Sequence, residues 1–134
     1  MFVSRFALGY LLLTGFVVSI WALLLPESFY AGFPGLGRAW VSADGPYNGH
    51  LIRDTGAAYL MIAALAGLSL LRPDRAPPAA VGFATLFFKV PHPANHATHL
   101  GMYVTIDRVG NALTLGTAVF CSAWLAIPRG SARP

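Results

Sequence analysis

The sequence predicts an all-α fold, a bundle of four transmembrane helices with both termini in the cytoplasm. Three observations predict it: an apolar composition, four long apolar segments, and basic residues gathered in alternate connections. Of the 134 residues 56% are hydrophobic and 10% are charged, against about 25% charged residues in soluble domains. Because so few charges would not cover a water-facing surface, we expect one domain, residues 1–134, embedded in a lipid bilayer.

Four apolar segments are long enough to cross a bilayer, since a crossing helix needs about 20 residues. The expected spans cover residues 6–25, 51–71, 79–100 and 107–127. The first connection, residues 26–50, is long and contains Phe29, Tyr30, Phe33, Trp40 and Tyr47 among glycines and prolines. Aromatic rings favour the headgroup level of a membrane. We therefore expect this connection to lie on the membrane as a lid over one end of the bundle.

Two prolines, Pro91 and Pro93, stand within the third expected span. Neither has a backbone N–H, so the carbonyls of Phe87 and Lys89, four residues back, lose their helical hydrogen bonds. A helix that stopped before the prolines would have about 12 residues, too few to cross a bilayer. The sequence therefore predicts a kinked helix that continues to Leu100.

The distribution of arginines predicts the orientation. In a four-span protein the termini and the second connection share one side, and five of the nine basic residues lie there: Arg5, Arg72, Arg75, Arg129 and Arg133. By the positive-inside rule both termini are cytoplasmic, in a multi-pass protein of the cytoplasmic (inner) membrane. The net charge of +4 is thus mainly a topology signal. No Lys/Arg cluster indicates nucleic-acid binding, and the lone Cys121 excludes an intramolecular disulfide.

A histidine stripe near the end of the third span is the strongest functional signal. His92, His96 and His99 follow at spacings of four and three, with Lys89 one turn before them. On an α-helix these spacings place the side chains on one face. Titratable side chains are costly inside a membrane and mark functional sites there. Since imidazole is the commonest metal ligand, the stripe predicts a metal site.

Further polar residues stand at the outer ends of the other spans. The topology predicts that they converge with the histidines: Asn48, His50, Arg53 and Asp54 before or within the second span, Asn95 in the third, and Asp107, Arg108 and Asn111 in the fourth. His50 and Asp54 are the expected additional ligands to His92, His96 and His99. The other residues and Lys89 are expected to bind a ligand or orient the metal ligands. Imidazole with carboxylate suits zinc, iron or copper(II), and haem is a further candidate.

Several functions fit this site. The first is a metal-binding or haem-binding membrane protein, with redox or oxygen chemistry possible at the metal. The second is a metal-free carrier or binding protein for a small apolar or protonatable molecule, and the third is an accessory subunit of a larger membrane complex. Imidazoles that bond to Asp54 and Asp107 would also hold helices together with no ligand at all. The sequence contains no nucleotide-binding loop and no nucleophile elbow, and it does not decide whether the protein is an enzyme. A homo-oligomer is also compatible with the sequence.

The segments GPYNGHLIRDTGAAYL and VPHPANHATHL, with LLPESFYAGFP and IDRVGN, carry a resemblance that covers most of the chain, residues 25–111. Together they resemble a group of small, uncharacterised four-helix bacterial membrane proteins that are loosely DoxX-like. The resemblance implies the four-helix fold and a set of recurring site residues: Asn48, His50, Arg53, Asp54, His92, His96 and His99. The chain departs from the usual form at Pro93, where Leu or Val is expected. The resemblance implies no particular activity.

Overall fold

The computed structural model describes residues 2–128, so Arg129 and Arg133, which contributed to the predicted orientation, lie outside the described residues. Three long helices correspond to the first, second and fourth expected spans: α1 (Phe2–Leu24), α4 (Gly49–Leu71) and α7 (Thr105–Ala126). Their mean hydropathies of 2.1, 1.5 and 1.4 make each long and apolar enough to cross a membrane. These three helices indicate a multi-pass membrane protein.

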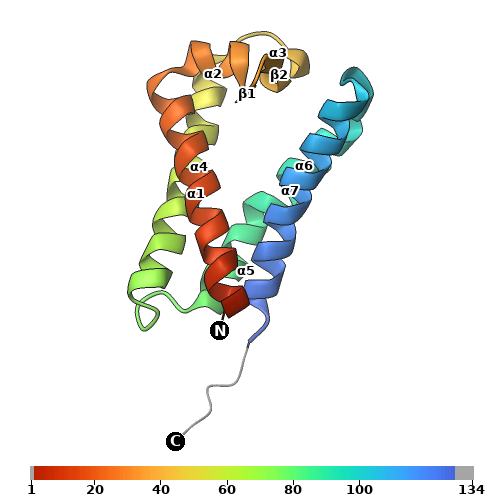
Figure 1. Ribbon diagram of the computed structural model, residues 1–134. Helices are drawn as coiled ribbons and strands as arrows, with labels where there is room; N and C mark the ends of the chain where they lie inside the picture. The colour runs from red at the N-terminus through yellow and green to blue at the C-terminus, as the bar shows by residue number, and fades with distance from the viewer. Residues whose placement is uncertain (1, 129–134) are drawn as a thin grey trace, which may run out of the picture.

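The third expected span, predicted as one kinked helix, is divided into two helices at Val90. Helix α5 covers Pro78–Lys89 and α6 covers Pro91–His99. Val90 between them keeps helical angles, φ −89° and ψ −55°, so α6 continues along the path of α5 (Figure 1). The helix is interrupted here because Pro91 and Pro93 have no backbone N–H and so remove two of three successive hydrogen bonds of the helical ladder. A 3₁₀ turn, η1 (Leu100–Met102), then leads to α7.

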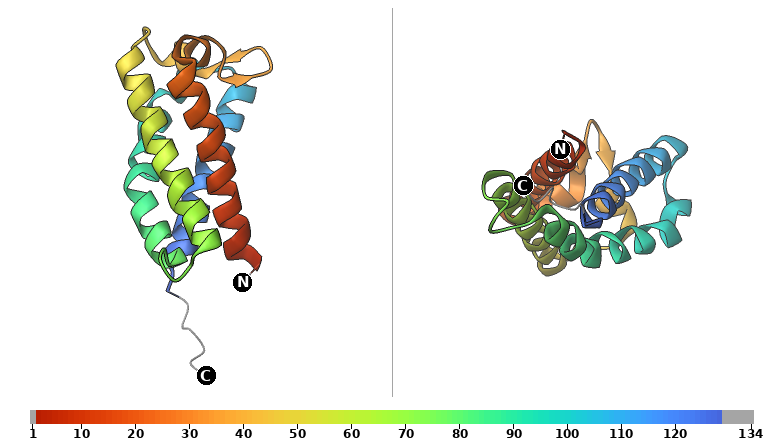
Figure 2. Two further views of the ribbon diagram at one scale, coloured as in Figure 1. Left: turned by 90° about the vertical axis from the view of Figure 1, so that its left-hand side faces the viewer. Right: turned by 90° about the horizontal axis from the view of Figure 1, so that it is seen from below.

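The long helices form two arms, α1 with α4 and α5–α6 with α7, seen from three directions in Figures 1 and 2. Glycines allow the close approach within the first arm. A Cβ atom on Gly15 would lie 2.9 Å from the carbonyl oxygen of Tyr59, and one on Gly56 would lie 3.0 Å from Leu23 Cγ. Small residues of this kind are typical contacts between membrane helices, since they let backbones pack closely.

The second arm is joined just as closely. A Cβ atom on Gly82 would lie 2.5 Å from Leu125 Cβ and 2.6 Å from the Ser122 carbonyl oxygen. The buried Thr85 hydroxyl donates to Ser122 Oγ at 3.0 Å, which links α5 to α7 one turn further on. The arms meet at the end where α1 begins and α7 ends, the narrow end, and diverge toward the opposite, wide end (Figure 1).

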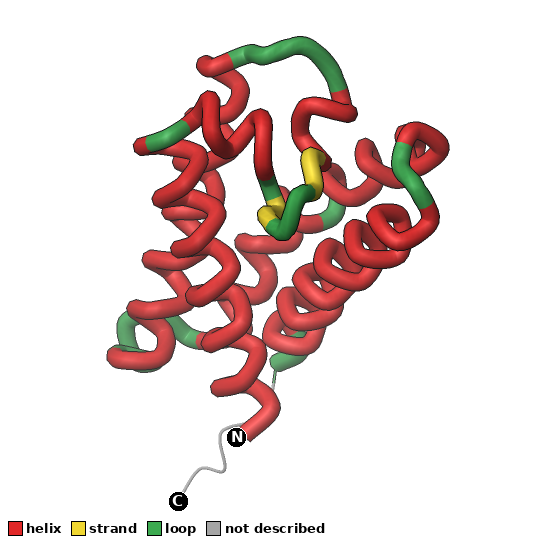
Figure 3. Tube along the Cα trace, turned by 45° about the horizontal axis from the view of Figure 1, so that its top comes forward, coloured by secondary structure: helices red, strands yellow, loops and turns green. Residues whose placement is uncertain are grey.

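The connection between α1 and α4 lies across the wide end (Figure 3). It folds as α2 (Pro26–Gly32), a short hairpin of β1 (Pro34–Gly35) and β2 (Arg38–Ala39), and α3 (Trp40–Asp44). Leu36 and Gly37 form the hairpin turn with φ angles of +57° and +73°, the pattern of a two-residue type I′ turn. We call residues 26–44 the lid, and their position agrees with the lid expected from the sequence.

The glycine contact between α5 and α7 generates a stability prediction. Gly82→Ala places a methyl group against the α7 backbone, and overpacking of this kind costs about 1–3 kcal/mol. We expect a lower melting temperature in detergent. The matched control is Gly116→Ala on α7, where a new Cβ would meet nothing within 4 Å. Equal melting temperatures for the two variants would contradict this packing.

Candidate functional site

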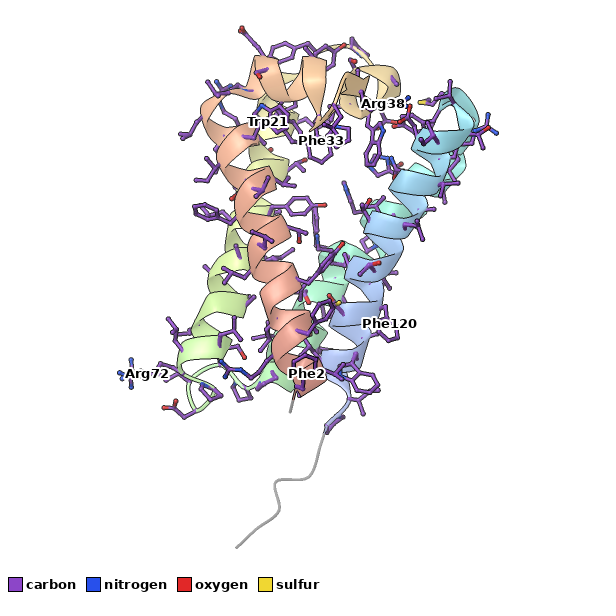
Figure 4. All side chains as sticks on the ribbon, in the orientation of Figure 1. Phe2, Trp21, Phe33, Arg38, Arg72 and Phe120 are labelled. Carbon is purple, nitrogen blue, oxygen red and sulfur yellow. The ribbon has the colours of Figure 1, made fainter. Side chains whose placement is uncertain are left out.

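A cavity of about 590 Å³ lies between the two arms, beneath the lid. This volume falls within the range of about 300–1,000 Å³ that is usual for small-molecule sites. Most of the wall is apolar and comes from every part of the fold: Leu13, Val17 and Val18 of α1, Leu51 and Ile52 of α4, Leu115 and Ala118 of α7, and Phe29, Phe33 and Val41 of the lid. Figure 4 shows Phe33 extending from the lid toward the space between the arms.

The broken helix supplies four polar residues of the cavity wall. Lys89 is the last residue of α5, and His92, Asn95 and His96 follow on α6. All four line the cavity. Because Val90 keeps a helical conformation, the spacings of three and four still place Lys89, His92 and His96 on one face across the break. Asn111 on α7 and Asp44 in the lid add an amide and a carboxylate to the same cavity.

Lys89 is buried, with 2% of its surface exposed. Its ammonium nitrogen lies 3.8 Å from the centroid of the Tyr59 ring and 5.5 Å from that of Phe88. These are cation–π contacts, which strengthen when the cation is removed from water. Within residues 2–128 no carboxylate forms an ion pair with this lysine.

The rings of Phe88, His92 and His96 contact one another in that order along α5 and α6. The His92 ring lies parallel to Phe88 at 4.9 Å between centroids and meets His96 edge-on at 4.7 Å. His96 Nδ1 and Asn111 Oδ1 are buried with no hydrogen-bond partner among the described residues. A buried polar atom without a partner costs about 1–3 kcal/mol. A bound molecule or water in the cavity would remove this cost.

The four polar site residues expected at the start of α4 do not line the cavity. His50 Nε2 lies 3.3 Å from Asp54 Oδ2, and both side chains are exposed, at 88% and 62%. Asn48 caps the helix by accepting a hydrogen bond from the Leu51 backbone N–H at 3.1 Å. Arg53, also exposed, donates to the Gly49 carbonyl at 3.4 Å. The structure thus leaves these four side chains apart from His92 and His96.

Two further site residues, His99 and Arg108, have structural contacts instead. His99 is exposed, with its Nδ1 3.0 Å from the Asn95 carbonyl oxygen. Arg108 donates to the carbonyl oxygens of Tyr103 and Gly101 at 2.6 and 3.1 Å, and so holds the turn before α7. Helix α6 packs against α7, and its last turn leads through η1 to the turn that Arg108 holds.

Asp107 fastens the lid to α7. Its carboxylate accepts hydrogen bonds from Trp40 Nε1 at 2.9 Å and from Arg38 Nη1 at 3.4 Å. Tyr103 adds a second link, because its hydroxyl donates to the Trp40 carbonyl at 3.0 Å. Burial, and then the carboxylates of Asp44 and Asp107, raise the pKa of Tyr103. The phenol therefore stays protonated and able to donate at neutral pH.

The described part of the chain contains no group of three or more His, Cys, Asp or Glu side chains that could hold a metal ion. A metal site formed by His92, His96, His99, His50 and Asp54 therefore stays a prediction. Only His92 and His96 of these five residues line the cavity.

Some cavity residues were missed in the sequence. Tyr59 contacts the lysine, and Trp40 both lines the cavity and binds Asp107. A tyrosine in the middle of an apolar span was the available signal for Tyr59, because its hydroxyl needs a polar neighbour there. Nothing in the sequence distinguishes Trp40 from the other aromatic residues of the lid.

Comparison with known proteins finds no matching family model, no matching curated protein and no matching solved structure. The resemblance to DoxX-like proteins accordingly stays a prediction from the sequence.

Proposed function

We propose that this protein is a membrane-embedded binding or carrier protein whose cavity takes one small, mainly apolar molecule. The observation that carries the proposal is a cavity of about 590 Å³ whose wall is mainly apolar and includes a limited number of polar groups. Ligand sites combine a largely apolar surface with few oriented polar groups in this way. Lys89, His92, His96 and Asn111 would fix the polar end of the ligand.

The proposed orientation has four crossings, with α5 and α6 together as the third and both termini in the cytoplasm. A broken helix is tolerated at membrane depth where it lines a cavity, and this pair lines one. The lid then faces the outer side. A reporter that is active only in the cytoplasm should work at the carboxyl terminus and fail when inserted at Ser42 in α3, because arginines gather on the terminal side. The opposite pattern would overturn the orientation.

Photolabelling with a small apolar aryl diazirine in lipid nanodiscs tests the binding function. Excess unlabelled analogue should suppress labelling of cavity residues such as Thr55, because a cavity holds a limited number of molecules. Labelling of the outward-facing Phe83, which is 61% exposed, should not saturate in the same way.

Two cavity-filling substitutions, Ala118→Trp and Thr55→Phe, should each remove the saturable labelling, since both residues line the cavity. Phe120→Trp is the matched control, because this ring is 62% exposed and points away from the cavity in Figure 4. If excess unlabelled analogue does not reduce labelling of the cavity residues in the wild-type protein, the binding function is contradicted.

A metal-binding function is the second candidate. It is favoured by the contact between the His92 and His96 rings, 4.7 Å apart, and by the unpartnered His96 Nδ1. Two imidazoles would leave the remaining coordination positions of zinc, iron or copper to water or to the bound molecule. Metal analysis of the purified protein, together with an optical spectrum for haem, tests this candidate, and a near-stoichiometric metal that His96→Ala loses would support it.

A further inference from the structure

Lys89 is the sole lysine of the sequence, and its charge is not balanced within the described fold. The side chain is 2% exposed, and its neighbours in reach are the aromatic rings of Tyr59 and Phe88. A buried cation is costly unless it is paired, far more so at membrane depth. A ligand that carries one negative charge would supply the missing partner.

The other polar groups of the cavity suit an oxyanion. His96 can donate from Nδ1 in the tautomer that carries the proton there. The Asn111 amide is 3% exposed and can donate from its NH₂ group once it is turned about its last side-chain bond. Among residues 2–128, Asp44 in the lid is the one carboxylate that lines the cavity, and it would repel a second negative charge on a ligand.

The cavity wall includes apolar residues of α1 that are also exposed on the outer surface of the bundle. Leu13 and Val17 of α1 both line the cavity and are 65% and 50% exposed. Both belong to the middle turns of a helix long and apolar enough to cross the membrane. An apolar chain could therefore enter between α1 and α7 from the hydrocarbon region, without passing through water or through the lid.

We infer that the cavity binds a single-chain apolar carboxylic acid, with its carboxylate on Lys89 Nζ and its hydrocarbon chain toward Leu13 and Val17 of α1. This inference rests on the proposed binding function and names the chemical class of its ligand. One lysine balances one carboxylate. An alkyl phosphate, with a charge of about −1.5 to −2 at neutral pH, would leave an excess negative charge beside Asp44.

The experiment compares four probes with the same twelve-carbon chain: dodecanoate, dodecanol, dodecylamine and dodecyl phosphate. Binding to the full chain is measured at neutral pH in nanodiscs of zwitterionic lipid, with empty nanodiscs as the background. Hydrogen bonds to charged groups favour the acid over the alcohol by about 10- to 100-fold. We expect dodecanoate to bind more tightly than dodecanol by this factor, and dodecylamine to bind most weakly.

Substitution of Lys89 tests whether its Nζ atom causes the preference for the acid over the alcohol. Lys89→Met keeps the length of the side chain and removes its charge, so the acid and the alcohol should bind within about 3-fold of each other. Arg53→Met is the matched control, because this cation is exposed on α4 and does not line the cavity. It should leave the preference for the acid unchanged. If Lys89→Met does not fold, the four-probe comparison on the wild type still tests the carboxylate assignment. Lys89→Arg, which keeps the positive charge, should then keep the preference for the acid.

The outcomes distinguish a failure of the carboxylate assignment from a failure of the proposed binding function. Equal affinity for acid and alcohol in the wild type, or a preference that survives Lys89→Met, would overturn the carboxylate assignment. Tighter binding of dodecyl phosphate than of dodecanoate would overturn it too, in favour of a lipid phosphate. If Ala118→Trp still removes binding in these cases, the cavity function stands. If no probe binds above the empty nanodiscs, the cavity function fails as well.

Discussion

The close contact between α5 and α7 at Gly82 sets the geometry of the whole molecule. It joins the second arm at the narrow end, and beside the cavity the Tyr10 hydroxyl connects the two arms by donating to the Thr114 carbonyl at 3.0 Å. At the wide end the lid lies between them and is bound to α7 through Asp107. The arms therefore diverge from a fixed contact, and the space between them is lined by side chains of every helix and of the lid.

The break at Pro91 and Pro93 determines which polar groups face that space. It ends α5 at Lys89 and starts α6 with the two histidines that line the cavity. A cation at the end of a helix is favoured by the helix dipole, which offsets part of the cost of burying Lys89. The same break leaves the carbonyls of Phe87 and Lys89 without the helical partners that a proline nitrogen cannot provide.

Hydropathy alone predicted most of the helices, because crossing a bilayer requires long apolar segments whatever their packing. The expected bounds agree with α1, α4 and α7 to within a few residues. The break at Val90 was harder to predict, since a kinked helix and two short helices satisfy the same composition. The predicted site residues also fall into two groups, one that lines the cavity and one that does not. Lys89, His92, His96 and Asn111 line one cavity, whereas His50 and Asp54 pair with each other on an exposed face. Sequence spacing fixes the face of a helix but not the direction in which that face is turned.

The central claim is that Lys89 lies within an aromatic, water-poor cavity between the arms. Because the chain has one lysine, selective isotope labelling of lysine gives one side-chain signal by NMR in nanodiscs. The position of Nζ over the Tyr59 ring, 3.8 Å from its centroid, predicts an upfield ring-current shift of the neighbouring methylene protons, which Tyr59→Leu should abolish. Methylene shifts equal to those of a solvated lysine, and unchanged in Tyr59→Leu, would contradict the account.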